Sequence, residues 1–306
     1  MKKLSLVLSL LMAASYSYAG TDGGSAASFL RLGSGAKASG MGEAYSTITE
    51  GPDSLYYNPG GVVFAEGKKI SFNHMSYIES TSYDTLYYSQ KIKEGKAFGM
   101  GLQYFSYGSI NETDLSGTKI GSYSPKDLAF SLGYSLKIKS KYSLLNGGGV
   151  GVSVKYVNLK IKDSATAFAS DIGFLTPVIN KKFRAGFVIQ NIGTKIKFDS
   201  EKEKLPLTFK TGFSYIPFSN LITSLDMVLP NDSDFYFSLG TAYRKKFSEM
   251  NMVLRAGYNG LNSDVSGFSG FNFGVGFEFS KISIDYAFMP YGDMGEGHRI
   301  GLSFAF

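Results

Sequence analysis

Alternation of apolar residues with small or polar ones, repeated along most of the chain, is the feature that most limits the fold. In the segment 271–279 every second residue is Phe or Val, and the residues between them are Asn, Gly, Gly and Glu. The segments 128–138 and 299–306 follow the same rule. Successive side chains of a β-strand point to opposite faces, so each segment predicts a strand with one apolar and one polar face.

About fourteen such segments lie between residues 68 and 306, an even number within the range of bacterial outer-membrane barrels. No window after residue 20 holds the roughly 18 apolar residues that a membrane helix needs. The alternation slips in phase at 154–161, where we expect a β-bulge. The predicted strands begin near Ile70, Thr85, Phe98, Leu128, Val150, Thr166, Phe183, Leu207, Ile222, Phe235, Met252, Phe271, Ile282 and His298.

The first residues predict export. Lys2 and Lys3 precede an apolar stretch at 4–14, and Ser17-Tyr18-Ala19 offers the small residues of a cleavage site. These features are typical of a signal peptide that is removed after Ala19, and the alternative is a retained N-terminal anchor. We therefore divide the chain into a signal peptide (1–19), a Gly-rich segment (20–67) and a barrel (68–306).

Alternation alone does not orient the sheet, because a soluble sandwich or a lipocalin-like barrel would point its apolar face inward. The export signal, the small residues on the polar face and the aromatic C-terminus favour the membrane. A mean hydropathy of -0.03 fits a barrel that averages an apolar outside with a polar lumen. We predict an all-β fold: a transmembrane, antiparallel, up-and-down barrel of about 14 strands with an N-terminal hatch in its lumen. Phe304 and Phe306 form the expected signal for the barrel assembly machinery.

The segment 20–67, called the hatch below, does not alternate. It has possible helices at 41–50 and 53–57, and Asn58 should be extended because it precedes Pro59. Its glycines permit close approach to another backbone, and the polar face of the strands is itself rich in glycine. We expect this segment to pack inside the barrel, with a loose periplasmic tail as the alternative.

Two strings in the hatch, Gly35 to Tyr45 and Asp53 to Gly60, resemble the N-terminal signature of the PorV/PorQ family, a branch of the FadL-like outer-membrane barrels. Weaker matches at 190–193, 205–207, 285–288 and 297–300 extend the resemblance over nearly the whole mature chain. The resemblance implies a lumen hatch whose motif is Gly35, Gly40, Gly42, Asp53, Asn58, Pro59 and Gly60. The chain departs from the family at Gly60, where FadL-like proteins have alanine, and at Glu43, where glycine is frequent.

Charged residues on the predicted lumen face are biased toward cations. We expect them to pair with one another and with the hatch; a positive interior that attracts a carboxylate or another anion is the alternative. These residues are Lys137, Lys155, Asp171, Arg184, Lys210, Arg244, Arg255, Glu278, Asp285 and Arg299.

Several function classes lack their residues. The chain has no Cys and two His, so it offers no disulfide, no thiolate metal site and no multi-histidine centre. The string 33–38 satisfies a loose dinucleotide pattern but lies outside any βαβ unit. The formal charge of +6 is spread along the chain, without a nucleic-acid patch. We expect no catalytic residue and no cofactor.

Three functions remain open. The first is binding or transport of small hydrophobic molecules through a hatch-closed lumen. The second, implied by the family resemblance, is an accessory barrel of a type IX-like secretion system that acts through its extracellular loops. A general porin is the third. The expected partners are outer-membrane lipid, the assembly machinery, and either a hydrophobic small molecule or secretion-system components.

Overall fold

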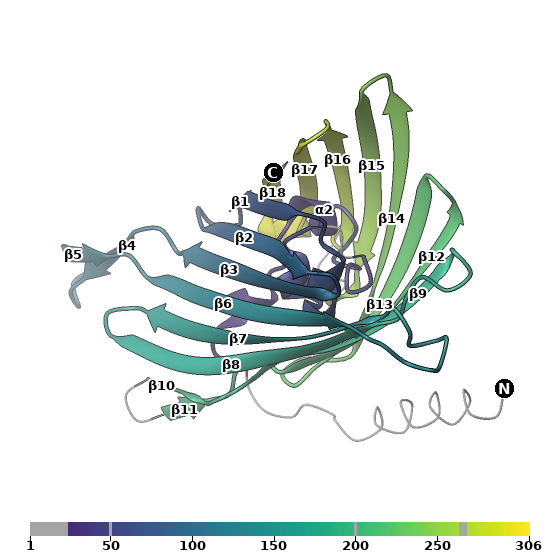
Figure 1. The fold of residues 1–306 in the computed structure, drawn as a ribbon. Coiled ribbons are helices and arrows are strands. Elements are labelled where there is room, and N and C mark those ends of the chain that lie inside the picture. Colours follow the sequence, from purple (N-terminus) through teal and green to yellow (C-terminus); the bar gives the residue numbers. More distant parts are fainter. Residues whose placement is uncertain (1–23, 49–50, 199–200, 263–267) are drawn as a thin grey trace.

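Fourteen antiparallel strands pair in chain order and close into a barrel where β1 bonds to β18 (Figure 1). The computed structural model describes residues 24–48, 51–198, 201–262 and 268–306, so the predicted signal peptide lies outside the described residues. The barrel strands are β1 (Lys68–Ser76), β2 (Ser82–Lys93), β3 (Lys96–Ser106), β6 (Lys126–Lys137), β7 (Gly149–Lys160), β8 (Ser164–Leu175), β9 (Phe183–Gly193), β12 (Thr208–Phe218), β13 (Leu221–Pro230), β14 (Tyr236–Phe247), β15 (Met250–Asn259), β16 (Phe271–Glu278), β17 (Ile282–Pro290) and β18 (Glu296–Ala305).

The predicted architecture and strand number are confirmed, but the bulge expected at 154–161 is wrong. β7 pairs with β6 and with β8 without a shift in register. The phase slips because Val157 and Leu159 face the lumen and join an apolar cluster with Phe29 and Leu30 of the hatch. The register shift in this part of the sheet lies between β8 and β9.

The apolar face of the strands points out of the barrel. On β16, Phe273 is 53 % exposed, whereas the adjacent Asn272 is 4 % exposed and lies in the lumen. Large apolar side chains are normally the buried ones in a soluble protein. Here a belt of exposed Phe, Leu, Ile and Val surrounds the barrel, as lipid tails require. The arrangement excludes the soluble sandwich and the lipocalin-like barrel.

The two ends of the barrel differ. The end where β1 starts and β18 ends has mostly short turns, apart from the longer connection 138–148, and is called the periplasmic mouth because outer-membrane barrels place short turns there. The other end, the extracellular mouth, carries two additional hairpins, β4 (Ile110–Thr113) with β5 (Lys119–Tyr123) and β10 (Ile196–Phe198) with β11 (Glu201–Glu203). The β4–β5 hairpin projects well beyond the rim, at the left of Figure 1.

The hatch lies inside the barrel as four short helical turns, η2 (Ser28–Arg31), α2 (Ala36–Ser39), α3 (Ser54–Tyr57) and η3 (Pro59–Phe64) (Figure 1). The helix expected at 41–50 is wrong, because Gly42 and Glu43 both have positive φ, at 62° and 64°, which a right-handed helix does not accept. Two further turns, η4 (Gly260–Asn262) and η5 (Gly292–Met294), lie in extracellular loops. Within the described ranges, no helix has the length and apolarity needed to cross a membrane.

Candidate functional site: the hatch and the lumen wall

The Asn58-Pro59-Gly60 turn sits on a floor of glycines from neighbouring strands. A side chain at Gly151 of β7 would lie 2.3 Å from the carbonyl oxygen of Pro59, and one at Gly149 would lie 2.1 Å from that of Gly60. Gly173 of β8 has the same relation to the side-chain oxygen of Asn58, at 2.1 Å. The lumen glycines therefore make room for the hatch backbone, which explains their number.

Asn58 holds this turn through both ends of its side-chain amide. Its nitrogen donates to the carbonyl oxygens of Ser46 (3.0 Å) and Phe174 (3.1 Å), and its oxygen accepts from the backbone amide of Gly60 (3.0 Å). The residue is fully buried and its backbone is extended, with φ −162° and ψ 103°. One side chain thus joins two parts of the hatch to the barrel wall.

The two departures from the family signature have local physical reasons. A Cβ at Gly60 would lie 2.8 Å from the carbonyl oxygen of Gly173, so alanine does not fit there without movement of the backbone. Glu43 has the positive φ that favours glycine. Its carboxylate accepts hydrogen bonds from Ser39 Oγ (2.7 Å) and Tyr57 Oη (2.8 Å), and these bonds offset the backbone strain.

The other glycines of the motif also mark close approaches. A Cβ at Gly40 would lie 2.9 Å from the Cα of Gly274 on β16, and one at Gly42 would lie 2.5 Å from the backbone nitrogen of Tyr258 on β15. Gly35 faces the carboxylate of Asp53 in the same way, at 2.5 Å. Burial raises the pKa of the Asp53 carboxyl above its ordinary value, and the positive charge of Lys37 partly opposes that change.

Side chains from around the barrel wall bond to the backbone of the hatch. Asp226 of β13 accepts from the amides of Tyr45 (3.1 Å) and Ser46 (3.0 Å). Five further contacts of this kind come from polar side chains of the wall. They are Asn73 to Ala36, Thr85 to Ser34, Gln190 to Tyr56, Ser224 to Ala44 and Asn272 to Ser39. Because each buried hydrogen bond contributes about 1 kcal/mol, together they fix the hatch in one position.

Five of the predicted lumen charges lie buried in the middle of the barrel. Lys155 contacts Asp171 at 2.8 Å. Arg255 contacts Asp285 at 2.9 Å, and Lys37 of the hatch approaches the same carboxylate at 3.7 Å. Arg299 donates to Ser39 Oγ and to the carbonyl oxygen of Leu32. In this group, lumen charges contact one another and polar groups of the hatch.

The other five predicted charges lie outside this central group. Arg244 and Glu278 form a two-bond ion pair at the rim, with distances of 3.1 and 3.2 Å. Arg184 lies over the ring of Phe64, and Lys210 lies 6.0 Å from the ring centre of Tyr56. Lys137 is exposed at the end of β6. Lys155–Asp171, Arg255–Asp285 and Arg244–Glu278 are therefore three separate ion pairs.

Sequence reasoning missed Asp226, Lys37 and the short polar residues that bind the hatch backbone. In the sequence these residues are marked only by their position on the lumen face. Many polar residues without a contact to the hatch occupy the same face, so position alone does not single them out. The described residues contain no group of three His, Cys, Asp or Glu that would suit a metal ion.

At the C-terminus, the rings of Phe304 and Phe306 stack at 5.6 Å, and both are exposed on the lipid side. Their role in assembly stays a prediction.

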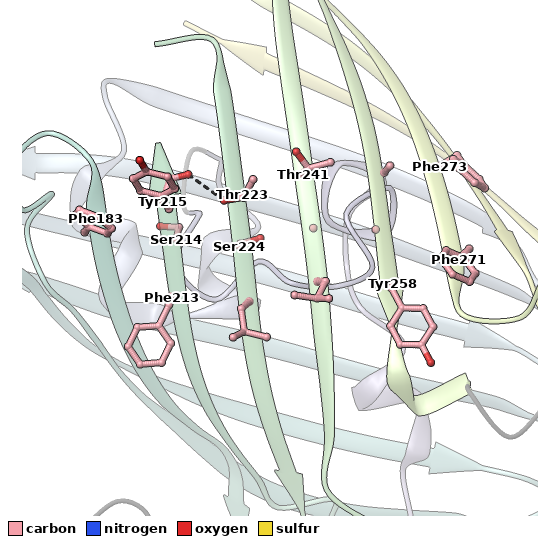
Figure 2. Close-up of a pocket in the computed structure, with 15 residues that line it drawn as sticks. Phe183, Phe213, Ser214, Tyr215, Thr223, Ser224, Thr241, Tyr258, Phe271 and Phe273 are labelled. Atoms are coloured by element: carbon pink, nitrogen blue, oxygen red, sulfur yellow. Dashed lines mark hydrogen bonds between the residues drawn. The ribbon is translucent and has the colours of Figure 1, made fainter. Parts of the chain in front are cut away.

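A groove of about 600 Å³ lies on the lipid-facing surface of β12–β16. Figure 2 shows Thr223 and Thr241 between the aromatic rings of Tyr215 and Phe273. Small side chains in this row leave the groove open. On the lumen side of the same wall, Gly240 and Gly257 contact Met41 of the hatch, so the barrier between groove and hatch is thin.

A barrel with an N-terminal hatch bonded inside its lumen defines the FadL-like class of outer-membrane barrels, and solved structures agree. The Pseudomonas putida toluene transporter TodX has a TM-score of 0.57 at 12% identity, and the match covers 89% of this chain and 96% of that one. A Pseudomonas aeruginosa FadL homologue has a TM-score of 0.51 at 10% identity, with 88% and 97% covered. At these identities the likeness establishes the fold.

The family follows from the sequence. A family model described as the type IX secretion system protein PorV matches residues 23–224, about two thirds of the chain. The chain therefore belongs to the PorV family and is an outer-membrane β-barrel. A search of curated proteins finds no matching relative. The family and the matched structures are membrane barrels and not enzyme families.

Proposed function

We propose that this protein is a plugged outer-membrane barrel that serves a type IX secretion system through its extracellular hairpins. The observation that carries the proposal is the fixed hatch. Asp226 and Arg299 of the wall bond to its backbone, and its Asn58 side chain donates to the wall carbonyl of Phe174. A barrel closed in this way is better suited to present a surface than to conduct. Membership of the PorV family supports the same function.

The β4–β5 hairpin is the part of the extracellular mouth best built for contact with another protein. Leu115 at its tip is fully exposed, and Ile110 and Ile120 on its strands are also exposed. Exposed apolar side chains on an ordered element are typical of interaction sites. Asp114 orders the tip, because its carboxylate accepts from the amides of Ser116 and Thr118, both at 2.9 Å.

A second set of contacts orients the hairpin on the barrel. Lys162, in the β7–β8 loop, binds Glu112 at 2.5 Å and lies 5.3 Å from the ring centre of Tyr123. The hairpin is thus held at its base and ordered at its tip. Because the hairpin is already ordered, it would lose less conformational entropy when it binds a partner.

The test is secretion and capture with a doubly substituted hairpin, Leu115→Asp with Ile120→Asp. We expect the variant to assemble in the membrane but to lose copurification with type IX components and with secreted proteins that carry the C-terminal signal. The control is Leu144→Asp, at an exposed leucine of the periplasmic connection 138–148. Unchanged capture by the double variant, or the same loss in the control, would count against the hairpin. We expect no catalytic activity in the wild type or in the variants.

Handling of a hydrophobic small molecule is the second candidate, and the lipid-facing groove favours it. The groove lies across a thin wall from Met41, so an apolar molecule released near the hatch would have a short sideways route. Ala256→Phe would fill the groove while keeping the lipid face apolar. If oleate and toluene uptake by cells is the same for this variant, for the wild type and for cells lacking the protein, the transport function is wrong.

A further inference from the structure

The two mouths of the barrel carry opposite charge. Among the described residues, the segments at the periplasmic mouth hold fifteen Lys or Arg and four Glu, whereas the extracellular connections hold six Lys and nine Asp or Glu. The periplasmic segments are 66–69, 91–96, 137–141, 181–184, 244–249 and 278–281. The described parts of the extracellular connections are 77–81, 107–125, 161–163, 194–198, 201–207, 231–235, 260–262, 268–270 and 291–295. Such an asymmetry produces a strong positive field at one mouth.

The periplasmic mouth is also hollow. A cavity of about 790 Å³ lies between the underside of the hatch and the ends of β14–β18 and β1. Its lining includes Lys37 of the hatch, Arg184 and Lys246. Glu278, one of its three acidic residues, is already paired with Arg244. The space below the hatch therefore has excess positive charge.

Several of these cations face the lumen and not the surrounding lipid. Lys91 pairs in register with Ala97, and Lys137 pairs with Gly149. Ala97 is fully buried inside the barrel, and Gly149 lies against the hatch. Paired residues of neighbouring strands point to the same side, so Lys91 and Lys137 belong to the lumen mouth.

Among the described residues, no ion pair joins Lys91, Lys137, Lys246 or Lys281 to a carboxylate. They come from β2, β6, β14 and the β16–β17 turn, so they lie at separate points around the mouth. One small anion would reach a few of them at most. An extended chain with several carboxylates would reach more.

We propose that the periplasmic mouth is a docking site for an acidic peptide segment of a periplasmic protein, which enters the cavity below the hatch. Charge complementarity of this kind gives fast, salt-sensitive association. The lumen-facing placement of Lys91 and Lys137 argues for a peptide over lipid headgroups, which lie outside the barrel wall. The site is independent of the extracellular hairpins. A peptide in the cavity would contact the hatch at Lys37, which is part of the cavity lining.

The experiment uses the full chain in nanodiscs of zwitterionic lipid and measures fluorescence anisotropy with a labelled ten-residue glutamate peptide. The test variant is Lys91→Gln, Lys137→Gln and Lys246→Gln together. The control is Lys119→Gln, Lys160→Gln and Lys202→Gln, three exposed lysines at the extracellular mouth. We expect the test variant to bind roughly tenfold or more weakly and the control to bind as the wild type does. Both variants should show the heat-dependent gel mobility of a folded barrel.

Three results would overturn the proposal. The first is equal binding by the test variant and the control. The second is complete displacement of the peptide by millimolar inorganic phosphate, which would indicate a small-anion site. The third is a test variant that loses affinity for vesicles containing phosphatidylglycerol but keeps its affinity for the peptide, because the lysines would then serve the membrane.

Discussion

Arg299 on β18 donates a 2.9 Å hydrogen bond from its guanidinium to Ser39 Oγ in the hatch, although 260 residues separate them in the chain. The same side chain donates to the carbonyl oxygen of Leu32 at 3.0 Å and is 1 % exposed. The last strand of the barrel and the hatch are thus joined directly. Because β18 also closes the barrel by pairing with β1, closure and placement of the hatch depend on the same strand.

Replacement of this arginine should weaken the whole assembly. Arg299→Met keeps a shorter apolar stem but leaves the carbonyl of Leu32 and the carboxylate of Glu43, 3.9 Å from the guanidinium, without their cation. Breaking a buried charged contact costs about 3–5 kcal/mol, which urea unfolding of the protein in detergent would measure. The control is Arg244→Met, which removes an ion pair at the partly exposed rim and should cost less than about 1 kcal/mol. Equal losses would mean that the hatch contact adds nothing.

Gly60→Ala should destabilise the turn that carries the hatch motif. The added methyl group would lie 2.8 Å from the carbonyl oxygen of Gly173 and 3.0 Å from that of Gly149, so the backbone must move. Overpacking of this kind costs about 1–3 kcal/mol. Limited proteolysis of the hatch should become faster. Gly24→Ala is the matched control, since no atom lies within 4 Å of the added group; an equal rate in both variants would contradict the prediction.

Two substitutions of Glu43 separate the effect of backbone strain on stability from the effect of the side-chain hydrogen bonds. Glu43→Gly loses the bonds from Ser39 and Tyr57 but relieves the positive φ of 64°. Glu43→Ala loses the same bonds and keeps the strain, which costs about 1 kcal/mol more. The expected order of unfolding free energy is wild type, then Glu43→Gly, then Glu43→Ala. A glycine variant less stable than the alanine variant would refute the strain argument.

The tip of the β4–β5 hairpin should depend on pH through Asp114. Hydrogen bonds from Ser116 and Thr118 lower the pKa of this carboxyl below its ordinary value. A group with a lowered folded pKa stabilises the structure above its unfolded pKa, and that contribution is lost as pH falls through the folded pKa. At neutral pH the tip is therefore ordered.

Asp114→Asn should imitate protonation, so amide exchange at Ser116 and Thr118 should become faster at neutral pH. The barrel strands should exchange at their original rates. Asp163→Asn, in the neighbouring β7–β8 loop, is the control for an exposed carboxylate. Unchanged exchange at the tip in Asp114→Asn would show that the turn is ordered by its backbone alone.

The plugged lumen predicts electrical silence. In a planar bilayer the wild-type protein should show no stable open channel, because the hatch is bonded to strands on several sides of the lumen. Arg299→Met should add brief openings as the hatch loosens. A steady conductance in the wild type would favour the general porin that the sequence left open.

The strands and their two faces could be predicted because alternation is a local property that each strand carries by itself. The placement of Phe273 outside and Asn272 inside required only a decision about orientation. The hatch segment could also be recognised, from its glycines and from the Asn58-Pro59 turn. The error at 154–161 arose because Val157 and Leu159 belong to the apolar cluster that also holds Phe29 and Leu30. A cluster between distant segments leaves no periodic signal in the sequence.

The partners of the lumen charges were decided by the tertiary structure alone. Arg255 and Asp285 lie on β15 and β17, two strands apart, and they meet because Gly276 between them has no side chain. That contact depends on the register of three strands, and register follows from barrel closure and not from any single segment. The sequence by itself determined an amphipathic sheet preceded by the Gly-rich hatch segment, because both patterns are set by residues close together in the chain. The binding of the hatch inside the lumen, and the cationic cavity beneath it, exist only once distant strands have closed into a barrel.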